Sequence, residues 1–264
     1  MNIYLVAISD REWVLDEAAN RYLPDLSLSE KRERIRPCVL ESYYYLRGDR
    51  GDRYMREFKS RYESFMLDSG TFTFLNSQQD TKIDFDNYLD RYIAFINRHD
   101  IDLFFELDID HIVGIQEVER MRAKLEKETG KKCIPVWHRS RGLDYWKRMI
   151  SEYKYVAIGG MVNKEIKKKE YDIFIPLLKM AREKGCKVHG LGFTPTKDMN
   201  TRYKFDSADS NSWQFGNISG LLYRYADGAI THLKEKGRSL RSREAAAHNF
   251  YQWYLYATYA KYYL

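Results

Sequence analysis

Aspartate residues stand at the ends of several short hydrophobic runs in this chain. Asp68 ends the run FMLD, Asp108 ends LFFELD, and Asp209 lies in FDSADSNSW. Carboxylates that gather at one site can bind a divalent metal, act as acid, base and nucleophile, or accept hydrogen bonds from the N–H edge of a purine-like base. The residue types alone leave these three chemistries open.

Histidine and glycine residues follow other runs of the same kind. His138 comes after IPVW, Gly159 and Gly160 follow YVAI, and the segment HGLG occupies residues 189–192. Each histidine could belong to a site or be a hydrogen-bonded core residue. The glycines could permit tight turns or let a planar ligand approach the backbone closely.

The elements that carry these residues alternate between strand and helix. Four amphipathic stretches predict helices at residues 84–99, 115–129, 143–153 and 171–184, and Asp84 is a candidate N-cap. Seven runs predict strands, at residues 2–9, 64–68, 103–108, 133–138, 155–159, 188–192 and 204–209. Repeated βα units require parallel strands covered by helices, so we predict an α/β fold, a (β/α)8 barrel of the TIM type.

Two regions interrupt the alternation. Residues 36–60, rich in Tyr and Arg, are expected to be an insertion after the first strand, and an eighth strand is expected around 221–225 or 228–232. The tail, residues 242–264, predicts one long helix. We therefore expect a single domain with two parts, the barrel at residues 1–216 and the barrel closure with the C-terminal helix at residues 217–264.

In barrels of this type the side chains that do chemistry lie at the C-terminal ends of the strands. An aspartate in that position is often only the N-cap of the next helix, but three different strands that end in aspartate at the same rim favour a shared site. The sequence therefore predicts that Asp68, Asp108 and Asp209 converge on one site.

The charge balance agrees with a polyanionic partner without requiring one. The chain of 264 residues has 44 Lys and Arg against 38 Asp and Glu, a net charge of +6. Its basic stretch KEKGRSLRSR could contact phosphates or form a solvated face. The cations assigned to nucleic-acid binding on this pattern are Lys234, Lys236, Arg238, Arg241 and Arg243.

Three widely separated cysteines, Cys38, Cys133 and Cys186, argue against a disulfide framework and against a CxxC zinc or iron–sulfur site. We expect them to be buried as small hydrophobic residues. No run approaches the roughly 18 uncharged apolar residues of a membrane span. A cytoplasmic location is therefore expected.

Several motifs together resemble those of the tRNA-guanine transglycosylase superfamily. They are FMLDSG, LD, IGG, HGLG and FDSADSNSW, and they occur in that family's order within residues 2–216. The likeness is greater to short phage-type members similar to queuine transglycosylases, which are thought to install 7-deazaguanines in DNA. For a phage-encoded chain the location would be the host cytoplasm.

The resemblance implies a role for each matching residue. Asp209 looks like the nucleophile that attacks C1′, with Asp206 in reserve, and Asp68 resembles the carboxylate that acts as general base or positions the base. Asp108 resembles the reader of the purine N–H edge, and His138 stands where the tRNA enzymes have a glutamine. The implied substrate pocket also includes Ser69, Gly70, Phe72, Gly159, Gly160, His189, Gly190 and Gly192.

The chain departs from the tRNA enzymes in lacking their C-terminal zinc subdomain, because no cysteine follows Cys186. No cofactor or metal is therefore expected, and DNA is preferred to tRNA as the partner. The predicted reaction replaces guanine by a 7-deazaguanine of the preQ0 or preQ1 type through a covalent aspartyl–sugar intermediate.

Three other functions stay open from the residues. The same pocket could serve a DNA glycosylase or nucleoside hydrolase with water as acceptor. Asp68, Asp108 and Asp110 could instead hold a divalent metal in a barrel enzyme of another kind. The chain could also be a binding module without catalysis.

Overall fold

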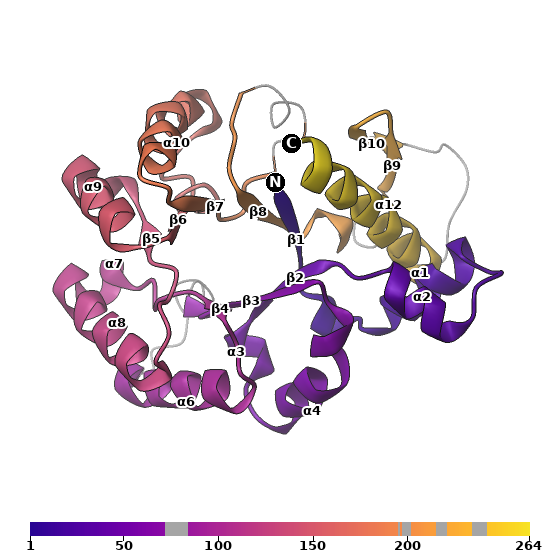
Figure 1. Ribbon diagram of the computed structural model, residues 1–264, viewed down its shortest axis with the longest axis horizontal. Coiled ribbons are helices and arrows are strands. Elements are labelled where there is room, and N and C mark those ends of the chain that lie inside the picture. The colour runs from indigo at the N-terminus through magenta and orange to yellow at the C-terminus, as the bar shows by residue number, and fades with distance from the viewer. Residues whose placement is uncertain (72–83, 195, 197–201, 215–220, 234–241) are drawn as a thin grey trace.

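Eight parallel strands form one curved sheet in the computed structural model of the chain (Figure 1). The structure describes residues 1–71, 84–194, 196, 202–214, 221–233 and 242–264. The strand order is β4-β3-β2-β1-β8-β7-β6-β5. The strands are β1 (Asn2–Val6), β2 (Cys38–Ser42), β3 (Ser64–Asp68), β4 (Leu103–Phe104), β5 (Val136–Trp137), β6 (Tyr155–Ile158), β7 (Lys187–Gly190) and β8 (Ser207–Ser210).

The two outer strands of this order, β4 and β5, meet and close the sheet into a ring. Phe105 and Ile134 form a parallel bridge just after β4 and just before β5. The amide of Ile134 donates to the carbonyl of Phe104 at 2.8 Å, and the amide of Glu106 donates to the carbonyl of Ile134 at 3.2 Å. The predicted TIM-type barrel is therefore confirmed.

The eighth barrel strand is not where the sequence pattern suggested. It is β2, which lies inside the stretch expected to be an insertion and pairs in parallel with both β1 and β3. The alternative candidates instead form an antiparallel hairpin outside the barrel, β9 (Leu222–Ala226) and β10 (Ala229–Leu233). Asp227 and Gly228 join them with φ of 51° and 77°, the conformation of a tight hairpin turn.

The helices that were predicted begin and end close to their expected positions. α8 (Ile115–Thr129) has the predicted bounds, and the side chain of Asp84 caps α6 (Phe85–Arg98) by accepting from the amide of Asn87 at 3.0 Å. The other helices are α1 (Trp13–Tyr22), α2 (Leu28–Arg34), α3 (Tyr43–Leu46), α4 (Asp49–Phe58), α7 (Asp110–Val113), α9 (Gly142–Glu152), α10 (Phe174–Glu183) and α12 (Ser242–Tyr263), with 3₁₀ turns η1 (Ile8–Asp10), η2 (Lys59–Arg61), η3 (Arg139–Arg141), η4 (Lys168–Ile173) and η5 (Ser212–Gln214).

Apolar side chains fill the inside of the barrel. Tyr4, Leu40, Met66 and Phe105 belong to this interior cluster and are buried. Figure 1 shows the helices outside the strands. Larger clusters of apolar side chains pack between the two. Because the interior is filled, a ligand has room at the ends of the barrel and not inside it.

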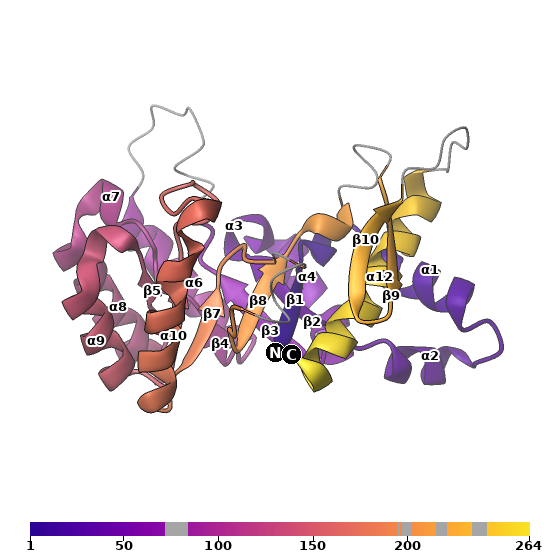
Figure 2. The same cartoon turned by 90° about the horizontal axis from the view of Figure 1, so that it is seen from above.

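The C-terminal helix α12 packs along α1, β1 and the hairpin, and it brings the two ends of the chain together (Figure 2). The N-terminal amino group donates to the carbonyl of Ala260 at 3.1 Å. The three cysteines are buried, as expected. None of the helices in the described part of the chain is long and apolar enough to cross a membrane.

Candidate active site

A cavity of about 280 Å³ lies at the C-terminal end of the strands. Every barrel strand contributes to it, either with its last residues or with the residues that follow. Its lining consists of Val6, Leu40, Ser42, Asp68, Thr71, Asp108, His111, Val136, His138, Gly159, Gly160, Val162, Asn163, Leu191, Gly192, Asp209 and Asn211. The structure thus brings Asp68, Asp108 and Asp209 together, although 141 residues separate the first from the last.

Of these three aspartates, Asp68 has the fewest hydrogen-bond partners among the described residues. Its Oδ2 accepts from the amide of Gly70 at 2.9 Å. Burial, together with the negative charges of Asp209 and Asp108, raises the pKa of Asp68 to about 7 against the opposing hydrogen bond from the Gly70 amide. At neutral pH this carboxyl group therefore exchanges a proton readily, as a general acid or base must.

Asp209 is held by two donors on one of its oxygens. The amide of Gly192 lies 2.6 Å and Nε2 of His189 lies 3.2 Å from Oδ1. Among the residues described, Oδ2 has no hydrogen-bond partner. The side chain is therefore fixed in place while one oxygen stays available at the cavity.

A buried chain of hydroxyl groups supports this arrangement from behind. Nδ1 of His189 lies 2.6 Å from the hydroxyl of Ser207, which also bonds the hydroxyl of Tyr155. If Ser207 donates to Nδ1, His189 carries its proton on Nε2 and donates it to Asp209. His189 is fully buried and acts on Asp209 rather than on a ligand.

Asp108 lies between two cations. Its Oδ2 is 2.7 Å from Nε2 of His138, and its Oδ1 accepts from Arg141 at 3.2 Å. Nδ1 of His138 lies 3.1 Å from Glu165. Burial alone would lower the pKa of His138, but Asp108 and Glu165 together raise it to about 10. The hydrogen bond from His138 in turn lowers the pKa of Glu165 to about 2.

Arg141 joins this group to a second set of carboxylates. Its side chain is 2% exposed, and it contacts Glu106 at 2.8 Å and Asp110 at 2.8 Å in addition to Asp108. Burial would raise the pKa of Asp110, but Arg141 lowers it below its ordinary value. Asp108 and Asp110 are therefore already neutralised by a buried guanidinium, which disfavours the metal site considered for them with Asp68.

Other predicted pocket residues lie behind the lining. Ser69, Gly70, His189 and Gly190 are buried supports, whereas Asp108, His138, Gly159, Gly160 and Gly192 line the cavity. Gly192 has a φ of +68°, and a Cβ there would lie 2.4 Å from Cγ2 of Val162. Its left-handed backbone therefore directs the amide toward Asp209 at a place where a side chain does not fit.

Asp206, the reserve nucleophile, is not part of this site. It precedes β8, exposed at the opposite end of the strand, where Oδ2 accepts from the amide of Val188 at 2.8 Å. The predicted strand began too early, so both aspartates were assigned to one end.

The predicted nucleic-acid contacts lie mostly beyond what the structure describes. Phe72, Lys234, Lys236, Arg238 and Arg241 fall outside the described residues. Arg243 is described, and it pairs with Glu17 at 3.1 Å and stacks 4.5 Å from the ring of Trp13. That cation is therefore engaged within the fold.

Several residues of the site were not predicted from the sequence. Ser42 and Asn211 line the cavity, and Oγ of Ser42 is buried without a partner among the described residues. Arg141, in η3 after β5, holds Asp108, and Glu165, after β6, holds His138. Asn211 stands inside the FDSADSNSW motif, which could have indicated it, but no local pattern marks Arg141 or Glu165.

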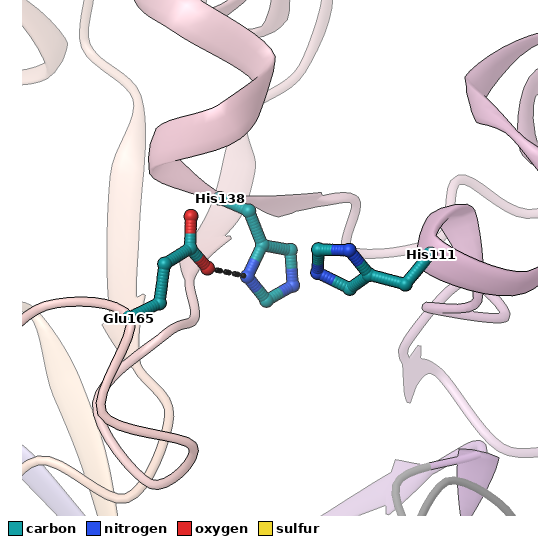
Figure 3. A group of neighbouring side chains, drawn as sticks. All are labelled: His111, His138 and Glu165. Carbon is teal, nitrogen blue, oxygen red and sulfur yellow. Dashed lines mark hydrogen bonds and ion pairs between the residues drawn. The ribbon is translucent and has the colours of Figure 1, made fainter.

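One group of side chains at the rim has ligands suited to a metal. His111, His138 and Glu165 each offer a ligand atom, and these atoms lie within 4.8 Å of one another (Figure 3). The three come from the segments that follow β4, β5 and β6.

Comparisons with known proteins assign no family to the chain. Neither a protein-family model nor a curated protein matches it. Among solved structures, it is similar to the carboxyl transferase domain from Rhizobium etli pyruvate carboxylase with 3-hydroxypyruvate, at 15% identity and a TM-score of 0.47, over 99% of this chain and 48% of that one. The same domain with 3-bromopyruvate matches at 15% identity and a TM-score of 0.46, with the same coverage of 99% and 48%. The chain spans about half the length of these structures, and the likeness gives it no activity.

Proposed function

We propose that the chain exchanges a guanine-type base in nucleic acid, preferably DNA, for a 7-deazaguanine. One observation carries the proposal: Asp68, Asp108 and Asp209, from three different strands, line a single cavity of about 280 Å³. This volume is at the lower end of the roughly 300–1,000 Å³ of ordinary ligand pockets, so it suits one flat heterocycle rather than a larger molecule.

Asp108 is the residue suited to recognise the base. Its two oxygens already accept from His138 and Arg141, and each carboxylate oxygen has a second lone pair left. Two adjacent acceptors match the ring N–H and the exocyclic amine of guanine, whereas a thymine edge would present an acceptor. Because both nitrogens of His138 are engaged, it holds Asp108 rather than contacting the base itself.

Asp209 is the residue suited to attack the sugar. Its Oδ2 would form a bond to C1′ as the bond from C1′ to the base nitrogen breaks, and the departing guanine would take a proton from an acid. The incoming 7-deazaguanine would then lose its N9 proton and attack C1′, which releases Asp209 as a carboxylate. A carboxylate stabilises the oxocarbenium character of both steps and can trap the sugar covalently.

Asp68 is the residue suited to move the proton. Its pKa of about 7 means that both protonation states are populated near neutral pH. It could give its proton to the departing guanine and recover one from the incoming base. A single carboxyl group can serve in both directions because the two half-reactions mirror each other.

The target base has to leave the helix to reach this cavity. Flipping a nucleotide out of a duplex costs a few kcal/mol, which contacts in the pocket must offset. The cavity is rich in carboxylates, so phosphates must be held outside its mouth by the chain's net positive charge of +6.

Label transfer tests the proposal directly. Purified chain is incubated with DNA, or with tRNA in parallel, and with radiolabelled guanine or a labelled 7-deazaguanine, and both label in the polymer and abasic sites are measured. We expect label to enter DNA, and a protein–DNA adduct to survive denaturation.

Variants at the two ends of β8 separate loss of the nucleophile from loss of a charge. Asp209→Asn should lose the adduct and at least about 10³-fold in exchange rate, because the nucleophile is gone. Asp206→Asn removes the same charge from the opposite end of β8 and should keep both. Abasic sites without label would assign the chain to base hydrolysis, and full activity of Asp209→Asn would refute the proposed nucleophile.

A further inference from the structure

We propose that His111, His138 and Glu165, at the rim of the cavity, form a binding site for one divalent transition-metal ion such as Zn²⁺. The proposed base exchange requires no metal ion at these residues, since neither His111 nor Glu165 takes part in it. The inference therefore goes beyond the proposed function and can be tested without it.

The first support is the placement of the three side chains. One ligand atom from each lies within 4.8 Å of the other two. Figure 3 shows the Glu165 carboxylate at one edge of the His138 ring and the His111 ring at the other edge. The side chain of His138 is 6% exposed, that of Glu165 20% and that of His111 49%. Two ligands are thus fixed by the fold, and the exposed third would have to swing past the edge of the His138 ring to reach an ion beside Glu165.

The second support is that His138 has an aspartate behind it. Metal-bound histidines usually donate their other ring N–H to a carboxylate, which fixes the tautomer and the ring orientation. With Nδ1 of His138 on the ion beside Glu165, Nε2 keeps its hydrogen bond to Asp108 at 2.7 Å.

An independent observation gives His111 the same kind of partner. Oδ1 of Asp110 is buried and has no hydrogen-bond partner among the described residues. It lies 3.9 Å from Nε2 of His111, beyond hydrogen-bond distance. A rotation of the His111 ring would let one of its nitrogens donate to this acceptor while the other binds the metal. The unsatisfied oxygen is thus accounted for if His111 has a second position.

The ligand types select the class of ion. Two imidazoles and one carboxylate suit Zn²⁺ and neighbouring first-row ions, whereas Mg²⁺ and Ca²⁺ prefer oxygen ligands. Three protein ligands leave a coordination position open, as in catalytic rather than structural zinc sites. Because His111 and His138 line the cavity, this position would be available to an oxygen of a ligand bound there.

Without an ion, His138 bridges Asp108 and Glu165 as a positively charged group. An ion must therefore displace one proton from His138, which weakens its binding relative to a site that is free of competing partners. The ion then takes over the role of holding Glu165 in place.

Cobalt substitution tests the site without any assay of activity. Co²⁺ is titrated into the metal-free full chain, and its visible absorption reports His and carboxylate ligation, while calorimetry with Zn²⁺ gives the stoichiometry. We expect one ion per chain. His111→Ala and Glu165→Gln should each weaken binding at least tenfold, and thermal unfolding checks that both variants stay folded.

His232→Ala is the matched control, since it removes a histidine from the hairpin, away from the rim. It should bind Co²⁺ like the unchanged chain, and so should Asp209→Asn. No stoichiometric binding at millimolar Co²⁺, or unchanged affinity in folded His111→Ala, would overturn the proposal. The readout is metal binding, so a failed base-exchange assay would not change this result. A failure to bind metal would likewise leave the base-exchange proposal untouched.

Discussion

Replacing Asp68 by Asn should stabilise the protein, because the fold holds an acidic group where its charge is unfavourable. The pKa of Asp68 rises from 3.8 to about 7 on folding, mainly through burial. Each pKa unit corresponds to about 1.36 kcal/mol between the two protonation states. The ionised form therefore costs the native state about 4 kcal/mol at most, and Asn removes this cost while its side-chain oxygen can still accept from Gly70.

The stabilisation expected of Asp68→Asn depends on pH. Between pH 4 and pH 7 the unfolded chain has lost the Asp68 proton, whereas the folded chain still holds it. The folded state binds more protons in this window, so rising pH destabilises the native protein through this group. The advantage of Asp68→Asn should therefore be near zero below pH 4, increase through the window and stay constant above pH 7.

Denaturant unfolding at pH 5 and pH 8 measures the difference between variant and native chain. We expect the advantage of Asp68→Asn to grow by about 2–3 kcal/mol between these values. Asp25→Asn, which removes a charge from an exposed position, should stay within about 0.5 kcal/mol of the native chain at both. An advantage that is independent of pH, or larger at pH 5, would refute the reasoning about the environment of Asp68.

Two further substitutions examine how the other aspartates are held. Gly192→Ala places a Cβ 2.4 Å from Val162 at a φ of +68° and shifts the amide that holds Asp209. We expect label transfer to fall about a hundredfold and the native state to lose about 1–2 kcal/mol of stability, and unchanged transfer would contradict this. Arg141→Met leaves three carboxylates without their shared cation, so denaturant unfolding should show a loss of about 3–5 kcal/mol; a loss below about 1 kcal/mol would mean that the network is not a structural unit.

The barrel could be predicted because its helices follow local rules. The apolar period of α6, its Asp84 cap and the left-handed Gly130 after α8 are all visible in the sequence. β2 escaped because its run CVLES contains Glu41, a buried acid whose partners are the amide and hydroxyl of Ser9 and the hydroxyl of Tyr54. These partners come from other segments, so nothing near Glu41 in the sequence indicates that it can be buried.

The same distinction between local features and distant partners applies to the site. The aspartates could be predicted because a strand end is a local feature and barrel geometry gathers strand ends at one rim. Their partners could not, because Arg141 and Glu165 reach His138 and Asp108 from separate loops. Asp206 was misplaced because the predicted strand began three residues too early. β8 begins at Ser207, so Asp206 lies at the other end of the barrel from Asp209.

The three aspartates differ in their partners, and this difference is what would divide the chemical roles among them. Asp108 is flanked by two cations, which suits a permanent acceptor for N–H groups. Asp209 is held on one oxygen by a backbone amide and a histidine, which suits a nucleophile that must point in one direction. Asp68 has backbone donors alone among the described residues, and burial raises its pKa to about 7, which suits a group that must take up and give off a proton. Neighbouring carboxylates with such different surroundings can recognise the base, attack the sugar and carry the proton at a single pH.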